Sequence, residues 1–321
     1  MANFKFLITT FLCITAVSIA GIYLLGDSRN AAAPGDDTLV VASFYPVYVA
    51  AENLLAGVDG TALENLSEPQ TGCLHDYVLT PEDMKLLSEA DIFVVNGGGI
   101  ESFLTDVASA YPDLKIIDAG AGLADTPDQP SANDEDEDEA NAHYWMSIPL
   151  YERQVEAMRD GLCDFFSETK QSEQITANAS EYLTALHELE DQQADIAKDL
   201  AGTKVILFHE AYEYVAEDYG MEVAYLLDLD EERQVSAGEV ADVVRAIEDN
   251  GVSLILAEEQ YGKEMGDLVS EETGVTVIYL DTIVRGANTD TPDAYLKRMQ
   301  NNIDLLRDYE KKTDAMRISL H

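Results

Sequence analysis

Six short apolar runs, each rich in β-branched residues, are spaced along the chain with helix-like stretches between them. Runs of this length and composition are typical of strands buried on both faces of a parallel sheet. Their alternation with helices predicts an α/β fold built from βα units. Because 321 residues suffice for two domains, we expect two lobes with mostly parallel sheets. The runs are Thr38–Phe44, Asp91–Asn96, Leu114–Asp118, Lys204–Phe208, Val252–Ala257 and Val275–Leu280.

One stretch breaks this alternation, because a single apolar stripe continues from Ser172 to Ala201. Its members recur at alternating steps of four and three, which predicts one amphipathic helix that begins near Ser172 and ends at Gly202. At about 1.5 Å per residue, the helix spans roughly 45 Å. Lying between two βα regions, it is expected to join one lobe to the other; a coiled-coil partner helix is the alternative. The stripe consists of Ile175, Ala179, Tyr182, Leu186, Leu189, Gln193, Ile196 and Leu200, of which only Gln193 is polar.

The N-terminus carries an export segment rather than part of the fold. Residues 6–25 are uncharged and mostly apolar, and they follow Lys5. This run is longer than a signal-peptide core of about 7–15 residues and matches a membrane helix of about 20. We therefore assign residues 1–25 to an export signal or a retained membrane anchor, and residues 26–37 to a linker. The rest of the chain is expected outside the cytoplasm, on the extracellular face of the membrane or in the periplasm.

The strongly negative charge of the chain argues against nucleic acids as ligands and is compatible with cations. It has 62 acidic and 19 basic side chains, a formal net charge of −43. Nucleic-acid-binding proteins need a basic surface, so that class is excluded. The charge fits a surface that attracts cations, or one adapted to high salt. Within residues 124–142, which we expect to form a mobile loop, lies an acidic run that would capture cations weakly. The run is Asp134, Glu135, Asp136, Glu137, Asp138 and Glu139.

Two potential metal donors, His209 and Asp281, each directly follow a predicted strand. In open α/β sheets, ligands bind beyond the carboxyl ends of the strands. His75 lies in a turn-like segment and His143 directly after the acidic loop. Three imidazoles and one carboxylate suit tetrahedral Zn²⁺, whereas Mn²⁺ favours more oxygen donors. Spacing alone also allows that these four residues never meet.

The remaining histidines and cysteines carry weaker signals. His187 lies beside the apolar stripe and is expected to be solvated, and His321 ends the chain. Outside the export segment only Cys73 and Cys163 remain, which is no disulfide framework, although the two could pair. Cys163 otherwise serves as a small buried hydrophobe.

Several short motifs occur in an order that resembles the zinc/manganese solute-binding proteins of bacterial ABC importers, the cluster A-I family. The resemblance covers essentially all of residues 39–308, with the long helix between the third and fourth motifs. No single motif is specific to this family, whereas the six motifs in this order are specific to it. The motifs are LVVASFYPVY at 39–48, HDYVLTP at 75–81, HYWMS at 143–147, FHEAY at 208–212, EEQ at 258–260 and YLD at 279–281.

This resemblance implies a metal site in the cleft between two lobes joined by the long helix. Carried over by position, the ligands would be His75 and His143 from the first lobe and His209 and Asp281 from the second. His209, at the third ligand position, resembles the histidine that zinc-binding members have there, whereas manganese-binding members usually have a carboxylate at that position. Zinc-type members also often carry a His-rich or acidic loop before the second ligand.

The sequence departs from the family pattern at several positions near the expected site. Glu259 stands where the family usually has proline, and Thr282 stands where the family often has proline. Cys73 is an extra soft donor two residues before His75, although four ligands already fill a tetrahedral zinc site. Glu258 follows a strand and is expected to orient a histidine rather than to bind the metal.

These observations predict an exported, monomeric zinc receptor that delivers Zn²⁺ to an ABC permease and has no catalytic role. A manganese or iron receptor of the same type is the first alternative. An extracellular zinc hydrolase is the second, although the chain has no His-Glu-x-x-His motif, and four protein ligands leave no position for an activated water. A surface adhesin without a metal would leave the donors at the strand ends unexplained. In domain terms, we expect a lobe at 38–171, the linking helix at 172–201 and a lobe at 202–321.

Overall fold

The computed structural model describes residues 37–319, apart from 73, 76, 124–140, 168, 228, 230–234 and 288. The export segment, most of the linker, the acidic run 134–139, Cys73 and His321 lie outside the described residues. None of the helices in the described part combines the length and the apolar character needed to cross a bilayer.

The first lobe is built on a four-stranded sheet of order β2-β1-β3-β4. The pairs β1·β3 and β3·β4 are parallel, with Val41 beside Phe93 and Phe93 beside Ile116. The strands are β1 (Thr38–Ala42), β2 (Thr61–Asn65), β3 (Ile92–Val95) and β4 (Lys115–Asp118), and the helices between them are α2 (Tyr45–Leu54), α3 (Pro81–Glu89) and α4 (Leu104–Ala110).

The second lobe repeats this arrangement, with strand order β6-β5-β7-β8 and parallel pairing throughout. The strands are β5 (Lys204–Leu207), β6 (Glu222–Leu226), β7 (Leu254–Ala257) and β8 (Thr276–Tyr279). They alternate with α7 (Tyr212–Asp218), α8 (Ala237–Asn250) and α9 (Glu259–Thr273). The predicted α/β class with two parallel-sheet lobes is therefore confirmed.

The six predicted strands are all present, but the sequence analysis missed β2 and β6. Both are edge strands, each with one neighbour in its sheet. Neither contains a fully buried residue, in contrast to β3 and β7, where every residue is buried. An edge strand exposed to solvent needs no continuous apolar run, so the pattern used to find strands was absent from Thr61–Asn65 and Glu222–Leu226.

The long amphipathic helix is confirmed as α6, which extends over Lys170–Leu200. It begins two residues before the predicted start because Thr169 and Ser172 form a reciprocal capping box. All eight residues of the predicted stripe are buried. Gln193 is buried too, since its amide donates a 2.9 Å hydrogen bond to the carboxylate of Asp218 in α7. The polar break in the stripe is therefore a contact with the second lobe.

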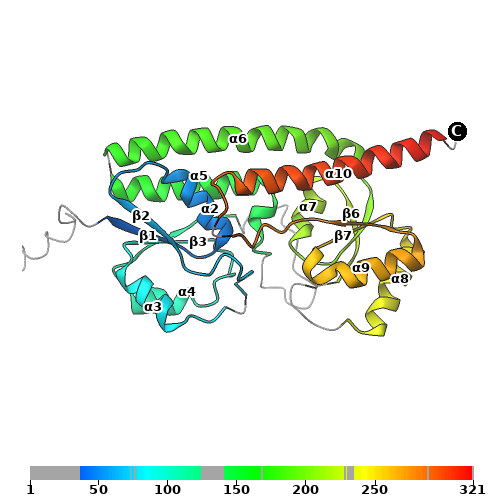
Figure 1. Ribbon diagram of the computed structural model, residues 1–321, viewed down its shortest axis with the longest axis horizontal. Coiled ribbons are helices and arrows are strands. Elements are labelled where there is room, and N and C mark those ends of the chain that lie inside the picture. The colour runs from blue at the N-terminus through cyan, green and yellow to red at the C-terminus, as the bar shows by residue number, and fades with distance from the viewer. Residues whose placement is uncertain are drawn as a thin grey trace, which may run out of the picture. The chain divides into compact units, whose positions relative to one another are not determined.

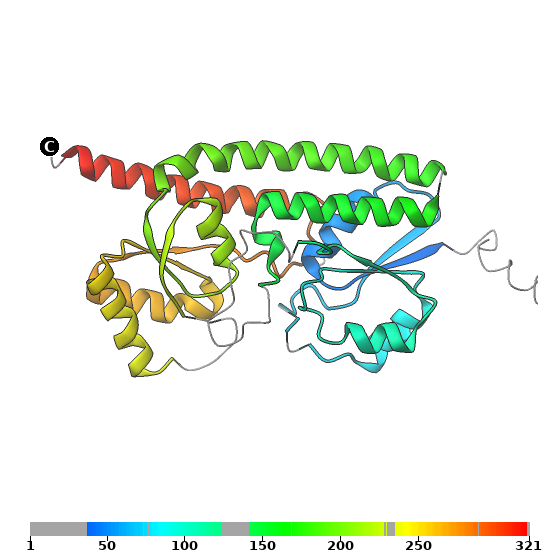
Figure 2. The same ribbon diagram turned by 180° about the vertical axis from the view of Figure 1, so that it is seen from behind.

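Helix α6 lies along both lobes and is joined there by two further helices (Figures 1 and 2). Helix α6 contacts α2 and α5 (Ile148–Phe166), which precede it in the sequence. It also contacts α10 (Ala294–Ser319), the last helix of the chain's described part. Helix α10 follows the second sheet in the sequence, yet it also contacts α2 of the first lobe. Both α6 and α10 therefore tie the lobes together.

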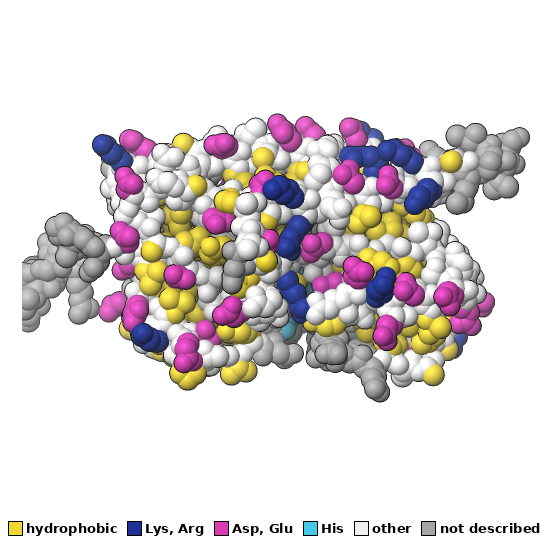
Figure 3. Space-filling model, in the orientation of Figure 1, with side chains coloured by type: hydrophobic (Ala, Val, Ile, Leu, Met, Phe, Trp, Pro, Cys, Tyr) yellow, Lys and Arg dark blue, Asp and Glu magenta, His cyan; other side chains and the backbone are white. Residues whose placement is uncertain are grey.

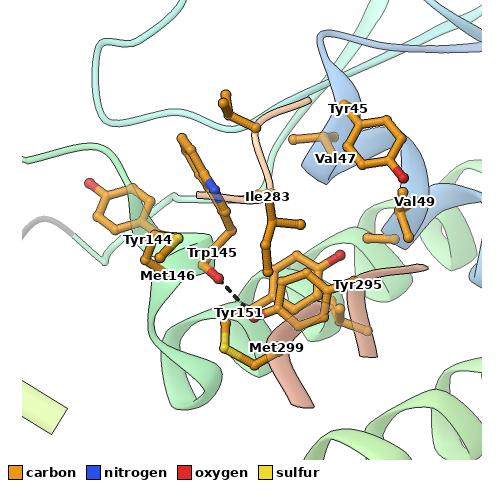
Figure 4. Packing of buried hydrophobic residues seen from close by; sticks show 14 of the residues in the cluster. Tyr45, Val47, Val49, Tyr144, Trp145, Met146, Tyr151, Ile283, Tyr295 and Met299 are labelled. Atoms are coloured by element: carbon orange, nitrogen blue, oxygen red, sulfur yellow. Dashed lines mark hydrogen bonds between the residues drawn. The ribbon is translucent and has the colours of Figure 1, made fainter. Parts of the chain in front are cut away.

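A buried aromatic cluster connects the lobes where α5 and α10 begin (Figure 4). Tyr151 of α5 stacks on Tyr295 of α10 with 3.9 Å between ring centroids. The Tyr295 hydroxyl donates a hydrogen bond to the carbonyl of Trp145, in the 3₁₀ turn η1 (Tyr144–Met146). Trp145 is fully buried, and its Nε1 donates to the carbonyl of Thr282, just after β8. This cluster positions η1, and with it His143, against the second lobe.

Candidate metal centre

Three segments bring histidines to the junction of the lobes. His209 follows β5 and is 1% exposed, and His143 directly precedes η1 and is fully buried. His75 lies in the connection from β2 to α3, with its side chain 38% exposed. Figure 3 shows a histidine side chain at the line between the lobes, on a face over which acidic side chains are widely spread.

The structure brings these three predicted ligands together, with His143 in the middle. Its ring centroid lies 5.4 Å from that of His75 and 5.1 Å from that of His209. It also lies 5.0 Å from the ring of Trp145, which fixes it to the buried aromatic cluster. The three imidazoles therefore share one site, although they are far apart in the sequence.

Glu210 is a further donor at this site that the sequence analysis did not assign. Its Oε1 lies 3.2 Å from Nδ1 of His143 and 3.7 Å from Nε2 of His75. Among the described residues, His75, His143 and Glu210 offer ligand atoms that all lie within 4.8 Å of one another. Glu210 is adjacent to His209 in the FHEAY motif, so its position beyond β5 was a signal that could have identified it.

Asn141 links the two lobes directly behind the imidazoles. Its Oδ1 accepts a hydrogen bond from the backbone N–H of His143 and lies 2.9 Å from Nδ1 of the same residue. Its amide nitrogen donates to the carbonyl of Glu210 and to the carboxylate of Glu213. No spacing pattern in the sequence marked this residue. A contact of this kind orients a histidine and tunes its basicity.

Burial sets the protonation state of His143. Desolvation, with further contributions from His209 and His75, lowers the pKa of His143 well below its usual range. The imidazole is therefore neutral at physiological pH, which is the form that binds a metal ion.

His209 is held differently. Its Nδ1 accepts a 3.0 Å hydrogen bond from the backbone N–H of Ala211, at the start of α7. A neutral imidazole carries one proton, so this contact places that proton on Nε2. Coordination through Nε2 would require the contact to change.

Asp281, the fourth predicted ligand, is not part of the group of close ligand atoms that His75, His143 and Glu210 form among the described residues. Its Oδ1 accepts a hydrogen bond from the backbone N–H of Ile283, and its Oδ2 lies 3.7 Å from the guanidinium of Arg298. Its backbone is held on both sides by the side chain of Asn302. Among the described residues, Glu210 supplies a carboxylate in contact with His75 and His143, and the assignment of Asp281 as a ligand stays a prediction.

The remaining predicted residues occupy other positions. Glu258 precedes α9 and accepts a hydrogen bond from the hydroxyl of Thr282, so it lies beside the segment that carries Asp281. Cys163 is a half-buried free thiol 3.5 Å from the carbonyl of Ser172 and from the hydroxyl of Thr176. His187 is exposed as expected, yet Nδ1 lies 2.8 Å from the carboxylate of Glu152.

The chain is similar to curated metal-binding proteins along most of its length. It is 25% identical over 236 residues to the manganese-binding lipoprotein MntA of Halalkalibacterium halodurans, which covers 72% of this chain and 75% of the relative. It is 24% identical to the zinc-binding protein AdcA of Streptococcus pyogenes, with 92% of this chain and 60% of the relative covered. The chain therefore spans less than two thirds of the length of AdcA.

The fold is shared with a solved zinc-bound structure. The Zn(II)-bound AdcA of Streptococcus pneumoniae superposes with a TM-score of 0.70 at 23% identity, covering 85% of this chain and 57% of that one. The profile of the family described as "Zinc-uptake complex component A periplasmic" (ZnuA) matches residues 40–309. The chain belongs to this ZnuA family of zinc-uptake proteins.

Proposed function

We propose that this protein is an extracytoplasmic receptor that binds Zn²⁺ between its two lobes and delivers it to the permease of an ABC importer. The observation that carries the proposal is the convergence of His75, His143 and His209 at the junction of the lobes, beside Glu210. Imidazole nitrogens with a carboxylate oxygen are a donor set that suits Zn²⁺. Family membership and the relatives named zinc-binding support the same function.

The ligand set of the receptor comprises the three histidines and one carboxylate. Asp281 is the carboxylate that the family resemblance implies, and Glu210 is the one adjacent to the imidazoles in this structure. Three nitrogen donors favour Zn²⁺ over Mn²⁺, which prefers oxygen. A manganese receptor remains the second candidate, because a relative of similar identity is named manganese-binding.

In this function, the lobes at 38–171 and 202–321 form the two walls of the binding site, and the helix at 172–201 holds them together. Residues 1–25 direct export or anchor the chain, so the receptor works outside the cytoplasm. It works as a monomer. The protein has no catalytic role, because tetrahedral Zn²⁺ with four protein ligands has no open position for water.

Competitive dialysis tests this function. The full chain is dialysed against equal concentrations of Zn²⁺, Mn²⁺ and Fe²⁺, and the retained metals are measured by elemental analysis. We expect one tightly held Zn²⁺ per chain, which His209→Ala loses and the exposed control Glu264→Gln on α9 retains. Retention of Mn²⁺ or Fe²⁺ in place of Zn²⁺ would assign the receptor to the alternative metal. Retention of no tightly held metal would overturn the receptor function.

A further inference from the structure

A second group of donors lies where α5 and α6 pack side by side (Figure 2). Glu152 belongs to α5, whereas His187 and Glu190 lie one turn apart on α6. Among the described residues, these three offer ligand atoms that all lie within 4.8 Å of one another. They belong to the helices that hold the lobes together and are not part of the site at the lobe junction.

Glu152 is the unusual member of this group because it is a carboxylate with 9% exposure. Its Oε1 is shielded from water and receives no hydrogen bond of ordinary geometry. It lies 2.8 Å from Nδ1 of His187, and that nitrogen is also 3.0 Å from the carbonyl of Leu183. Nδ1 carries at most one proton and makes its hydrogen bond to the carbonyl of Leu183, so the buried carboxylate is left incompletely satisfied.

The charges around Glu152 favour a cation. The pKa of Glu152 is raised to about 7, chiefly by burial; Glu190 and Glu156 also raise it, whereas His187 lowers it. The carboxylate of Glu152 in turn raises the pKa of His187. Two carboxylates thus lie beside one imidazole, so a single proton on His187 does not balance them. A dication would neutralise both carboxylates at once.

We propose that Glu152, His187 and Glu190 form a second site for a divalent cation of the zinc type, which clamps α5 to α6. One imidazole nitrogen and two carboxylate oxygens are ligands that Zn²⁺ accepts, and water completes the coordination. The ion takes the place of the Nδ1 proton of His187, next to Glu152. With three protein ligands, two of them partly or fully accessible to solvent, this site binds more weakly than the one between the lobes.

Zinc titration of the full chain tests the proposal. The titration is run at high salt, which suppresses the salt-sensitive binding expected of residues 134–139. Calorimetry should then resolve a weaker binding event after the tight one. We expect His187→Ala and Glu190→Gln each to raise the dissociation constant of this weaker event by at least about tenfold. Losing a residue that only orients a metal ligand already weakens metal binding by about that factor. The matched control is Glu188→Gln, also on α6 but exposed, which should leave that event within about twofold. Equal affinities in both variants and the control would overturn the proposal.

A second measurement identifies the binding residue directly. With ¹⁵N-labelled histidine, zinc added beyond one equivalent should shift the ring nitrogen signals of His187, identified as those missing from His187→Ala. Unchanged His187 signals at saturation would contradict the site. The His209→Ala chain, which lacks a ligand at the lobe junction, should keep the weaker event. Because Glu190→Gln alters a partly exposed side chain, it tests the site without the packing loss that a change at Glu152 would cause.

Discussion

Nδ1 of His143 lies 3.2 Å from the carboxylate of Glu210, and this contact joins the two lobes at the candidate metal centre. His143 comes from the segment before η1 and Glu210 from the segment after β5. Each is positioned by its own lobe, so the distance between them depends on how the lobes are held by α6 and α10. A metal ion bound by both residues would therefore bind the lobes to each other.

The carboxylate that completes the site can be identified by paired substitutions. If Asp281 moves to the ion when it binds, Asp281→Asn should weaken zinc binding at least about tenfold and Glu210→Gln should have a smaller effect. If Glu210 is the ligand, the order reverses. Dissociation constants from competition with a chelator measure both variants, with Glu264→Gln as the control. Equal and negligible effects of both substitutions would exclude a carboxylate ligand at either position.

Asn141 should matter for zinc affinity although it is not a predicted ligand. Replacing it with alanine removes the contacts that hold the backbone and ring of His143 and the carbonyl of Glu210. We expect a loss of about 10–100-fold in zinc affinity, as for other residues that orient metal-binding histidines. The control is Asn301→Ala on exposed α10 surface, which should have no effect. An Asn141→Ala chain with unchanged affinity would contradict the positioning role.

Gln193 should contribute to stability in spite of interrupting an apolar stripe. Gln193→Leu would continue the stripe, but it would remove the donor to the partly buried carboxylate of Asp218. We expect a loss of about 1–3 kcal/mol in the free energy of unfolding, measured by denaturant titration. Gln192→Leu, at the neighbouring and less buried position, should change it by no more than about 0.5 kcal/mol. A more stable Gln193→Leu chain would show that burial of leucine outweighs the lost hydrogen bond.

Glu101 should make stability fall as pH rises. Burial raises the pKa of this carboxyl from 4.5 to about 7, although it accepts backbone hydrogen bonds from Asn96 and Gly97. Between these two values the folded state binds more protons at Glu101 than the unfolded state. The contribution of Glu101 to stability is therefore greatest below pH 4.5 and is lost as pH rises through 7. The difference between these two pKa values corresponds to about 3 kcal/mol.

The Glu101→Gln chain isolates this contribution from the other acidic groups. The difference in unfolding free energy between the two chains should shift in favour of the glutamine variant by about 3 kcal/mol between pH 4.5 and pH 8. A difference that stays constant over this range would mean that Glu101 has the same pKa in the folded and unfolded states.

The fold could be predicted from the sequence where burial leaves a periodic pattern. Runs such as Leu254–Ala257 are buried on both faces, and the stripe of α6 is buried along its length, so both left continuous apolar signals. The edge strands β2 and β6 left none. Gln193 was recognised as a break in the stripe, but its partner Asp218 lies in another helix and could not be inferred from spacing.

The proximity of the three histidines was predictable for a different reason. The histidines were found because strand ends and motif order place them in one region, and the structure gathers all three. Glu210 was missed although its position beyond β5 was an available signal. Asn141 was missed because its role depends on the approach of the two lobes, which no local pattern encodes. The same holds for Glu152, whose burial beside His187 depends on the packing of α5 against α6.

The central claim is that the tight zinc site lies between the lobes and is built on His209, rather than on the acidic run 134–139. Calorimetric zinc titration of two variants at two salt concentrations tests it most directly. Deletion of residues 134–139 should leave one tight zinc per chain and remove only weak, salt-sensitive binding, because flexible carboxylates capture cations weakly. His209→Ala should weaken the tight site at least about 10–100-fold and leave the weak binding unchanged. If the deletion abolishes tight binding while His209→Ala retains it, the assignment of the site to the lobe junction is wrong.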